Sequence, residues 1–339
     1  MHDYLFRPEV VRVALVTGVI ISMLFYERIQ LTTGGAIVPA YLALHLPQPL
    51  YIASTVAAGY ATYLLVHRVL ARRKILYGRR KFEIEVLVGL AVVTLTGVLG
   101  SLLGTLDPTL IGLSGIGFLV PGILAHDMAR QRPGKTVLAV LATTGLLGVF
   151  VFVYSSLLEI APFDASDPVP LASVVGYPYD LLFVAAAVSV GIGMGVFARL
   201  QLRSGGFISG AYLAQVGPRW YDLVFALAVA LVTWYVVVHV LMPRLLLFGR
   251  RKLSTMVLVG AIVGWSAELA VSALTSGDYL PWRGLTVIPL MVPALLANDA
   301  QRQGWEKTVW GAGLTGVGVY AAMNLIAGLG AATGLIAGR

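Results

Sequence analysis

The chain has 339 residues, of which 58% are apolar and only 12% are charged, and its formal net charge is +8. Soluble globular domains carry about 25% charged residues, so this chain has too few charges to cover a surface facing water. It contains no cysteine, which excludes disulfides, thiolate metal sites and cysteine nucleophiles. The excess of Lys and Arg does not require nucleic acid as a partner, because the cytoplasmic loops of membrane proteins collect cations.

Long stretches with almost no charge predict membrane-spanning helices, each of which needs about 20 residues. They cover residues 13–26, 50–66, 85–106, 136–158, 181–198, 223–238, 256–275 and 308–336. We read the first as a transmembrane helix and not a removed signal peptide, because no small-residue cleavage site follows it. The predicted fold is an all-α polytopic membrane protein with two homologous halves of about 4–6 transmembrane segments each.

Two short segments interrupt the spans of the first half, at residues 34–46 and 110–125. At 1.5 Å per residue they cover about 20–24 Å, less than the ~30 Å hydrocarbon core. Pro39 and Pro121 lie in them, and Pro293 lies in the matching part of the second half. They are therefore predicted to be broken, tilted or re-entrant helices, whose freed carbonyls either line a polar cavity or mark a packing kink. If these segments cross the membrane, each half has six crossings and the chain has twelve, with both termini outside. If they are re-entrant loops, the number of crossings is smaller and some loops change side.

Paired glycines open one short segment in each half, Gly34-Gly35 in "TTGG" and Gly205-Gly206 in "RSGG". Backbone N–H groups at a helix start favour an anion, and Arg28 and Arg199 lie a few residues upstream. Broken helices at matching places in repeats also point to a membrane binding site. The alternative is an ordinary helix cap with a glycine hinge.

The first half carries a basic triplet, Arg79-Arg80-Lys81, and the second half repeats it as Arg250-Arg251-Lys252. The surrounding loops, residues 71–83 and 243–252, hold six cations against one acid and four cations against none, and are predicted to be cytoplasmic. The triplets either bind an acidic protein or a polyanion, or they only orient the chain and contact lipid headgroups.

Opposite charges three residues apart occur at Asp127 and Arg130 and again at Asp299 and Arg302. On a helix such residues face each other, which predicts a local ion pair or a carboxylate-and-arginine binding site. Glu268 lies within a span but has no acidic counterpart in the first half, so it is given no role. Isolated histidines such as His67 do not have metal-ligand spacing, and the sequence has no phosphate loop or nucleophile–base motif. No metal site, no cofactor and no catalysis by this chain alone are predicted.

The two halves are copies of one module. "RIQLTTGGAIVPAYLAL" from Arg28 matches "RLQLRSGGFISGAYLAQ" from Arg199, at an offset of 171, and the block from Leu119 matches the block from Met291 at an offset of 172. The predicted organisation is a first membrane repeat at 1–160, an extracytoplasmic linker at 161–177 and a second repeat at 178–339. "VPAYLA" and "VPGILA" also suggest a doubled unit within each half, which would be inverted if each inner unit crosses three times.

The motifs "VPAYLAL", "ILYGRRKF" and "LVPGILAHDMARQR" resemble the membrane subunit of bacterial poly-γ-glutamate synthase, the PgsC or CapC family. Members of that family match one copy, so the resemblance implies a fused tandem version. The chain departs from the family pattern at Ala40, Ala198, Ser209, Gly210 and His126. The two copies are therefore not assumed to be equivalent.

The resemblance implies a cytoplasmic-membrane subunit, either non-catalytic or co-catalytic, that scaffolds or activates an ATP-dependent amide ligase, PgsB or CapB; a contribution to export of the anionic polymer is a further expectation. ATP and Mg would belong to that ligase, and PgsA/CapA-like and small PgsE-like subunits or a second copy of this chain are further implied partners. The basic triplets with Arg28 and Arg199 are the predicted ligase- or polyanion-binding residues. The rival hypothesis is a free-standing secondary transporter or channel for a small anion.

Overall fold

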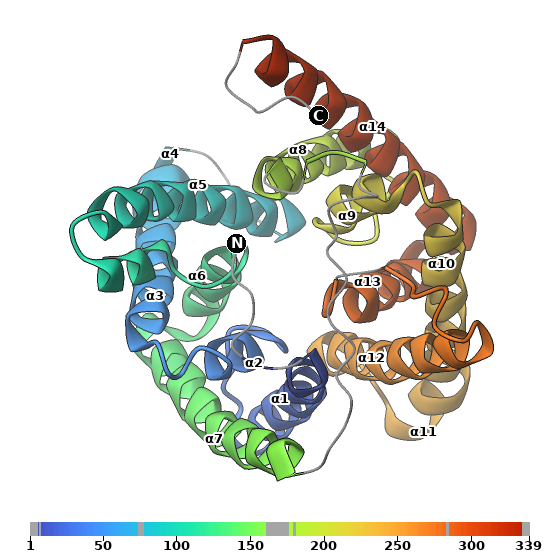
Figure 1. Ribbon diagram of the computed structural model, residues 1–339, viewed down its shortest axis with the longest axis horizontal. Coiled ribbons are helices and arrows are strands. Elements are labelled where there is room, and N and C mark those ends of the chain that lie inside the picture. Colours follow the sequence, from blue (N-terminus) through green and yellow to red (C-terminus); the bar gives the residue numbers. More distant parts are fainter. Residues whose placement is uncertain are drawn as a thin grey trace. The chain divides into compact units, whose positions relative to one another are not determined.

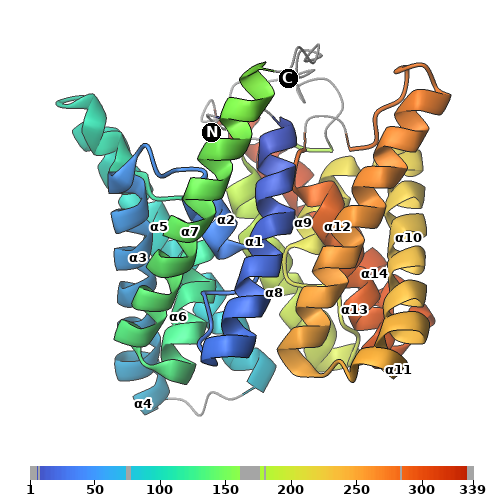
Figure 2. The ribbon, with the colours of Figure 1, turned by 90° about the horizontal axis from the view of Figure 1, so that it is seen from below.

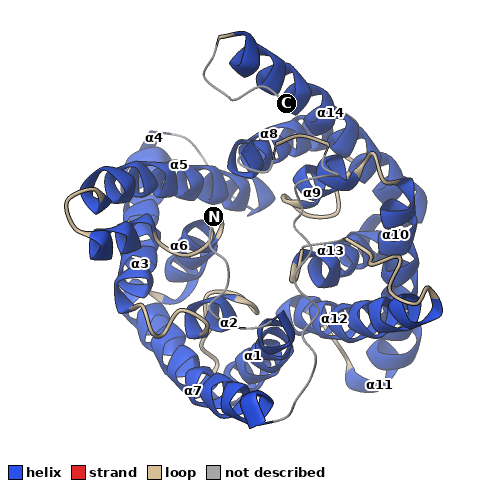
Figure 3. Cartoon of the chain, viewed as in Figure 1, coloured by secondary structure: helices blue, strands red, loops and turns tan. Residues whose placement is uncertain are grey.

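The computed structural model describes residues 6, 8–73, 78–160, 176–178, 181–282 and 285–333. Within those residues the chain is helical and has no β-strand (Figures 1 and 3). It forms two compact units, residues 2–164 and 165–339, called here the first and second units. Apart from residues 176 and 177, the predicted linker lies outside the described residues.

The first unit contains five longer α-helices, two short ones and two stretches of other helical geometry. In chain order they are α1 (Pro8–Ile29), α2 (Val38–Ala43), α3 (Pro49–Leu64), the π-helical η1 (Leu65–Leu70), α4 (Ala71–Arg73), α5 (Gly78–Gly104), the 3₁₀ η2 (Pro108–Ser114), α6 (Val120–Gln131) and α7 (Pro133–Ile160).

The second unit repeats this order, except that its described residues include no 3₁₀ stretch between α12 and α13. Its elements are α8 (Leu182–Leu200), α9 (Ser209–Val216), α10 (Trp220–Tyr235), the π-helical η5 (Val236–Leu241), α11 (Met242–Leu245), α12 (Gly249–Leu274), α13 (Ile288–Gln303) and α14 (Trp305–Ala332).

Eight helices among the described residues are long and apolar enough to cross a membrane, four in each unit. They are Glu9–Ile29, Pro49–Arg73, Gly78–Gly104, Pro133–Leu157, Leu182–Leu200, Trp220–Leu245, Gly249–Leu274 and Trp305–Gly330. This agrees with the predicted all-α polytopic membrane fold.

The two broken segments of the first unit each run from one end of the unit to the other (Figure 2). Residues 30–48 run antiparallel to α1, since Thr33 bonds Ser22 at 2.5 Å near the end of α1 while Ala40 packs against Gly18. Residues 105–131 run parallel to α3. The Ile116 N–H donates to Thr55 Oγ1 at 2.6 Å, and Leu124 packs against Gly59 one turn further along.

The chain therefore passes along the first unit six times, the number predicted for each half. Four passes are long helices, and each of the other two joins extended chain to a short helix. A re-entrant segment would return to the end of the unit where it began, whereas each of these two segments finishes at the opposite end. Pro39 and Pro121 stand in the first turns of α2 and α6, where the missing N–H removes no helical bond. The prediction that they interrupt helices was wrong for these two, and correct for Pro293, which lies inside α13.

The first unit is internally an inverted repeat. Helix α1 packs against α2 and α7, and in the same way α5 packs against α6 and α3; α2 packs on α7 as α6 packs on α3. The set α1, α2 and α3 can therefore be exchanged with the set α5, α6 and α7 without changing these helix contacts, and the broken segments of the two sets run in opposite directions. Glycine permits the closest approach, because a Cβ on Gly89 would lie 2.6 Å from the Gly122 N. Small residues at helix contacts are how membrane helices pack without a hydrophobic driving force between them.

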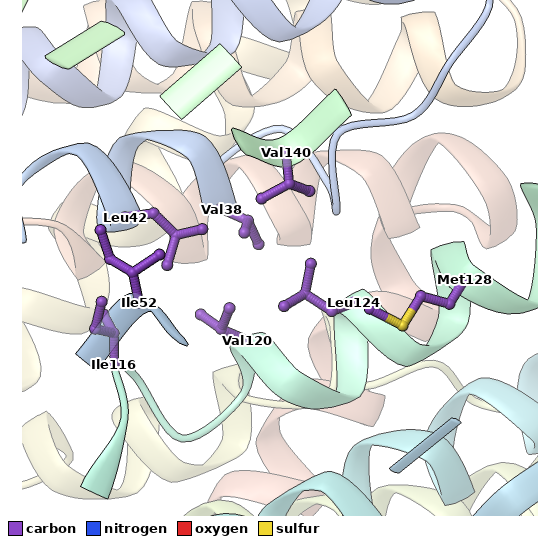
Figure 4. Close-up of a cluster of buried hydrophobic side chains, with 8 residues drawn as sticks. All are labelled: Val38, Leu42, Ile52, Ile116, Val120, Leu124, Met128 and Val140. Carbon is purple, nitrogen blue, oxygen red and sulfur yellow. The ribbon is translucent and has the colours of Figure 1, made fainter. Parts of the chain in front are cut away.

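The core of the first unit joins both broken segments (Figure 4). Its buried side chains come from α2, α3, α6 and α7 and from the chain before α6. They are Val38, Leu42, Ile52, Ile116, Val120, Leu124, Met128 and Val140. This packing fixes the ends of α2 and α6, and so positions the polar residues that lie at the beginning of one segment and the end of the other.

Candidate functional site

The first basic triplet begins α5, and two of its three cations are paired with acids one turn later. Arg79 Nε donates to Glu83 Oε1 at 2.6 Å, and Lys81 Nζ lies 3.9 Å from Glu85 Oε1. Both acids are buried, with Glu85 fully inaccessible. The positive charge of this triplet is therefore largely compensated within its own helix.

Glu85 is the centre of a buried polar group. His126 Nδ1, from α6, lies 2.6 Å from Glu85 Oε2, a hydrogen bond in which the carboxylate accepts. His67 Nε2, from η1, lies 3.6 Å from Glu85 Oε1. The His126 ring meets the Phe82 ring edge-on, with centroids 4.7 Å apart. Three separate elements thus hold one carboxylate inside an apolar unit.

Sequence reasoning missed this group. An acid in a membrane span is a functional candidate by default, and Glu85 was the signal that should have been followed. His126 is 41 residues away in sequence, so the pairing itself had no local signature. Among the described residues, no group of three or more His, Asp or Glu side chains is arranged to hold a metal ion.

A glutamine clamps the glycine turn of the first unit to the junction of α6 and α7. Gln131 Oε1 accepts from the Thr32 N–H at 2.6 Å, and Gln131 Nε2 donates to the Thr32 carbonyl at 2.6 Å. The same amide donates to Thr136 Oγ1 at 3.0 Å. Gly34 and Gly35 follow with φ of 76° and 99°, values that require glycine.

The second unit repeats the clamp. Gln303 Oε1 accepts from the Arg203 N–H at 2.8 Å, Gln303 Nε2 donates to the Arg203 carbonyl at 2.9 Å, and it also donates to Thr308 Oγ1 at 3.0 Å. This arrangement ties the start of one broken segment to the end of the other in both copies.

The N–H groups of the second glycine pair already bind an anion, which is the side chain of Asp299. Asp299 Oδ2 accepts from the Gly205 N–H at 3.1 Å and from the Gly206 N–H at 3.3 Å. The predicted anion site at these two glycines is thus occupied by a carboxylate of the chain itself. Asp127 holds the matching position in the first unit and is also buried.

Asp299 forms its ion pair across the loop. Its Oδ1 lies 3.8 Å from Arg203 NH1, whereas in the part of the chain that the structure describes no ion pair joins it to Arg302. The local pair predicted for Asp299 and Arg302 is therefore replaced by a contact to Arg203, because the carboxylate turns toward the glycine N–H groups.

Lys252, in the first turn of α12, is the buried cation of the second unit. It is 8% exposed and donates to the Gln301 side-chain oxygen. The charged groups that act on its ammonium are Arg302, Asp299 and Arg203. The structure thus brings Lys252, Asp299 and Arg302, all predicted site residues, together with Arg203, which was not predicted.

The two upstream arginines do not join these groups. Arg28 and Arg199 are exposed in the last turns of α1 and α8, where a cation complements the helix dipole. Neither is among the described residues that contact the glycine turns. Arg80 is exposed at the start of α5, and Arg250 and Arg251 begin α12.

Comparison with protein families shows one match in each half of the chain. The model of the family "Capsule biosynthesis CapC" matches residues 17–137 and again residues 181–309. The chain belongs to the CapC family. The two matched segments contain both glycine turns, both basic triplets and both glutamine clamps.

Curated relatives from this family match one copy. "PGA biosynthesis protein CapC" of Bacillus subtilis (strain 168) is 32% identical over 143 residues, which are 42% of this chain and 93% of that protein. "Capsule biosynthesis protein CapC" of Bacillus anthracis is 32% identical over 142 residues, 41% of this chain and 93% of that protein. No solved structure gives a significant match. A CapC protein of this kind thus corresponds to about half of the present chain.

Proposed function

We propose that this chain is the integral membrane subunit of a capsule-type poly-γ-glutamate synthase, with two CapC modules in one polypeptide. The observation that carries the proposal is the double family match, which covers both membrane units. The names of the two relatives, a PGA biosynthesis protein and a capsule biosynthesis protein, give the product class.

The charge distribution supports a role in holding a cytoplasmic ligase. Helix α4 carries Arg72 and Arg73, the start of α5 carries Arg79, Arg80 and Lys81, and the start of α12 carries Arg250, Arg251 and Lys252. By the positive-inside rule these ends face the cytoplasm. The exposed ones, Arg72, Arg73, Arg80 and Arg251, attract an acidic protein surface or an anionic chain within a Debye length of about 8 Å at physiological salt.

We assign the ATP-dependent amide chemistry, with its ATP and Mg, to that PgsB/CapB-like partner. The polar groups described above consist of carboxylates, histidines, amides and cations that bond to one another. None is a nucleophile next to a base among the described residues, as acyl transfer by this chain would require. In this proposal the membrane subunit orients the ligase at the membrane and receives the growing polyanion.

Export of the polymer is the second part of the proposal. Each unit combines inverted helix sets with broken segments, which is the architecture that transporters use to build a binding site near the bilayer midplane. Irregular backbone in a bilayer also has to be buried in protein or line an aqueous path.

Reconstitution tests the proposal. The purified chain is placed in liposomes with a CapB-like ligase, glutamate and ATP, and polymer yield and length are compared with ligase alone. We expect both to rise when the chain is present, and the ligase to co-purify with it. Unchanged yield and length would contradict the proposal.

The same inverted repeat favours a second candidate function, transport of a small anion by the chain alone. That function predicts substrate-driven flux in liposomes containing only this protein. The synthase proposal predicts no such flux without the ligase, so one preparation separates the two.

A further inference from the structure

The two units differ in charge at five matching positions close to the glycine turns. The first cluster consists of Thr32, Lys81, Glu85, Asp127 and Arg130, and the second cluster consists of Arg203, Lys252, Met256, Asp299 and Arg302. The first contains two cations and two acids, so its formal charge is zero. The second contains three cations and one acid, so its formal charge is +2. Two replacements account for the difference, Arg203 for Thr32 and Met256 for Glu85.

The second cluster has two more cations than acids, and its one acid is shared among several groups. Both glycine N–H groups share Asp299 Oδ2, and Arg203 is the cation nearest to Oδ1, at 3.8 Å. Lys252 bonds to the neutral amide of Gln301, although an ammonium has three protons to donate. Met256 is fully buried in an apolar group with Val237, Leu247 and Ala297, at the position where the first unit has Glu85.

Buried cations that outnumber their carboxylates are unfavourable, because their lost hydration is not fully replaced by opposite charge. Lys252 is more than nine-tenths buried, and Asp299, the acid that acts on it, is shared with two glycine N–H groups and Arg203, so the cluster favours a further anion from outside the chain. The ligand that fits is an oxyanion: Lys offers a point charge and Arg offers a planar fork that binds carboxylate or phosphate in two-point fashion.

We propose that the second cluster is a binding site for a carboxylate of the γ-linked glutamate chain, with Lys252 as its central ligand and Arg203 and Arg302 beside it. The site rests on the proposed function, because the synthase supplies a polymer with one carboxylate per residue at the end predicted to be cytoplasmic. The first cluster has no such site, since Glu85 already provides the carboxylate that Lys81 faces. Only one of the two copies thus binds the polymer.

Binding is measured with a fluorescent γ-linked glutamate oligomer and the full chain in nanodiscs of zwitterionic lipid. We expect Lys252→Gln to weaken binding by at least about tenfold, as expected for loss of a buried charge-assisted hydrogen bond. Lys252→Arg keeps the charge and should keep most of the affinity. Lys307→Gln is the matched control: it removes an exposed cation near the same end of the second unit and should change affinity by less than about twofold.

Arg302→Gln gives a second reading that does not alter a buried side chain, because Arg302 is exposed. It should weaken binding by about threefold to tenfold. Elution profile and thermal midpoint show that each variant is folded. Equal weakening by Lys252→Gln and Lys307→Gln would overturn the site and leave only a diffuse surface field.

Anionic lipid is the competing occupant, since its phosphate has the same oxyanion chemistry. Nanodiscs containing phosphatidylglycerol test it. If oligomer binding is lost in these nanodiscs, and if the chain retains phosphatidylglycerol but the Lys252→Gln variant does not, the site binds lipid and the proposal is overturned. Reconstituted synthesis distinguishes failure of the site from failure of the proposed function. If the chain stimulates polymer synthesis but oligomer binding does not depend on Lys252, only the site is refuted. If oligomer binding depends on Lys252 but the chain does not stimulate synthesis, only the synthase function is refuted.

Discussion

The first and second units keep the same scaffold and differ in the charges placed on it. Each has four long helices, two broken segments, a glycine turn and a glutamine clamp, Gln131 on Thr32 and Gln303 on Arg203. In the first unit Glu83 and Glu85 pair with Arg79 and Lys81 of the triplet. The second has Ser254 and Met256 at those positions. The clamp satisfies backbone groups that any copy of the fold must satisfy, whereas the charged side chains beside it differ between the two copies.

This difference gives separate proposed roles to the two copies, which the sequence analysis did not assume to be equivalent. The second unit offers positive charge to an anionic ligand. The first buries a carboxylate between His126 and His67, which is a rigid polar contact among α5, α6 and η1.

The largest expected effect comes from removing the one acid of the second cluster. Asp299→Ala leaves three cations together and two glycine N–H groups without an acceptor. Breaking a buried charged contact in this way costs about 3–5 kcal/mol of stability. Thermal unfolding of the purified protein in detergent measures it, with the exposed Asp278→Ala as control. A midpoint that falls equally in both variants would show that Asp299 does not hold the turn.

The next prediction converts the first cluster into the second. Thr32→Arg, Glu85→Met and His126→Asn together give the first unit the residues of Arg203, Met256 and Asn298, so Lys81 loses the carboxylate it faces and the formal charge of the first cluster becomes +2. We expect the stoichiometry of γ-glutamyl oligomer binding to rise from one to two per chain, with about 1–3 kcal/mol lost from stability as the His126 contact disappears. Unchanged stoichiometry in a folded variant would break the comparison between the clusters.

A third prediction concerns the opposite end of the second unit, where the copies also differ. Buried Asp222, which matches Tyr51 of the first unit, accepts from the Tyr279 hydroxyl at 2.7 Å and lies 3.0 Å from Arg219 Nε. Tyr279 lies outside the candidate spans. Burial raises the pKa of its hydroxyl above the ordinary value, and the hydrogen bond to Asp222 raises it further.

Because the folded state holds this proton more tightly, the contact stabilises the protein below about pH 10 and the stabilisation is lost as the pH rises further. Tyr279→Phe should therefore lower stability by about 1.5–3 kcal/mol at pH 8 and by progressively less above pH 10. Thermal midpoints of both proteins across this range measure the difference. A gap that stays constant with pH would refute the proton linkage.

The smallest expected effect comes from placing one acid beside the second triplet, as the first triplet has. Ser254→Glu places a carboxylate four residues after Arg250, as Glu83 stands after Arg79. Such a helical pair changes stability by only about 0.3–0.5 kcal/mol. Oligomer affinity should nevertheless fall by about twofold to threefold at low salt, and this fall should vanish at high salt. Ser254→Gln is the uncharged control, and an equal loss in both variants would indicate a steric cause.

The sequence predicted those parts of this account that depend on local pattern. Apolar runs gave the spans, repeated blocks gave the two copies, and the count of six passes per half agrees with the path of the chain in the first unit. Three features depended on contacts between distant residues and were not predicted. Glu85 accepts a hydrogen bond from His126, 41 residues away. The Asp299 carboxylate accepts from the N–H groups of Gly205 and Gly206, 94 and 93 residues earlier in the chain. Its ion pair is with Arg203 and not with Arg302.

The role of the prolines was misjudged for a physical reason. Within an apolar run a proline predicts a break, but it is equally compatible with the first turn of a helix that follows extended chain. Pro39 and Pro121 are of the second kind. Only the position where the extended chain ends distinguishes them, and tertiary packing sets that position.

The most direct test compares the two triplets in the reconstituted synthase. Arg79, Arg80 and Lys81 are changed to Glu in one variant, and Arg250, Arg251 and Lys252 in the other, with ligase, glutamate and ATP held constant. We predict that reversal of the second triplet lowers polymer yield more than reversal of the first, because it includes Lys252 of the proposed polymer site, whereas Lys81 of the first triplet faces Glu85. Equal yields from the two variants, or a larger loss from the first, would contradict the account.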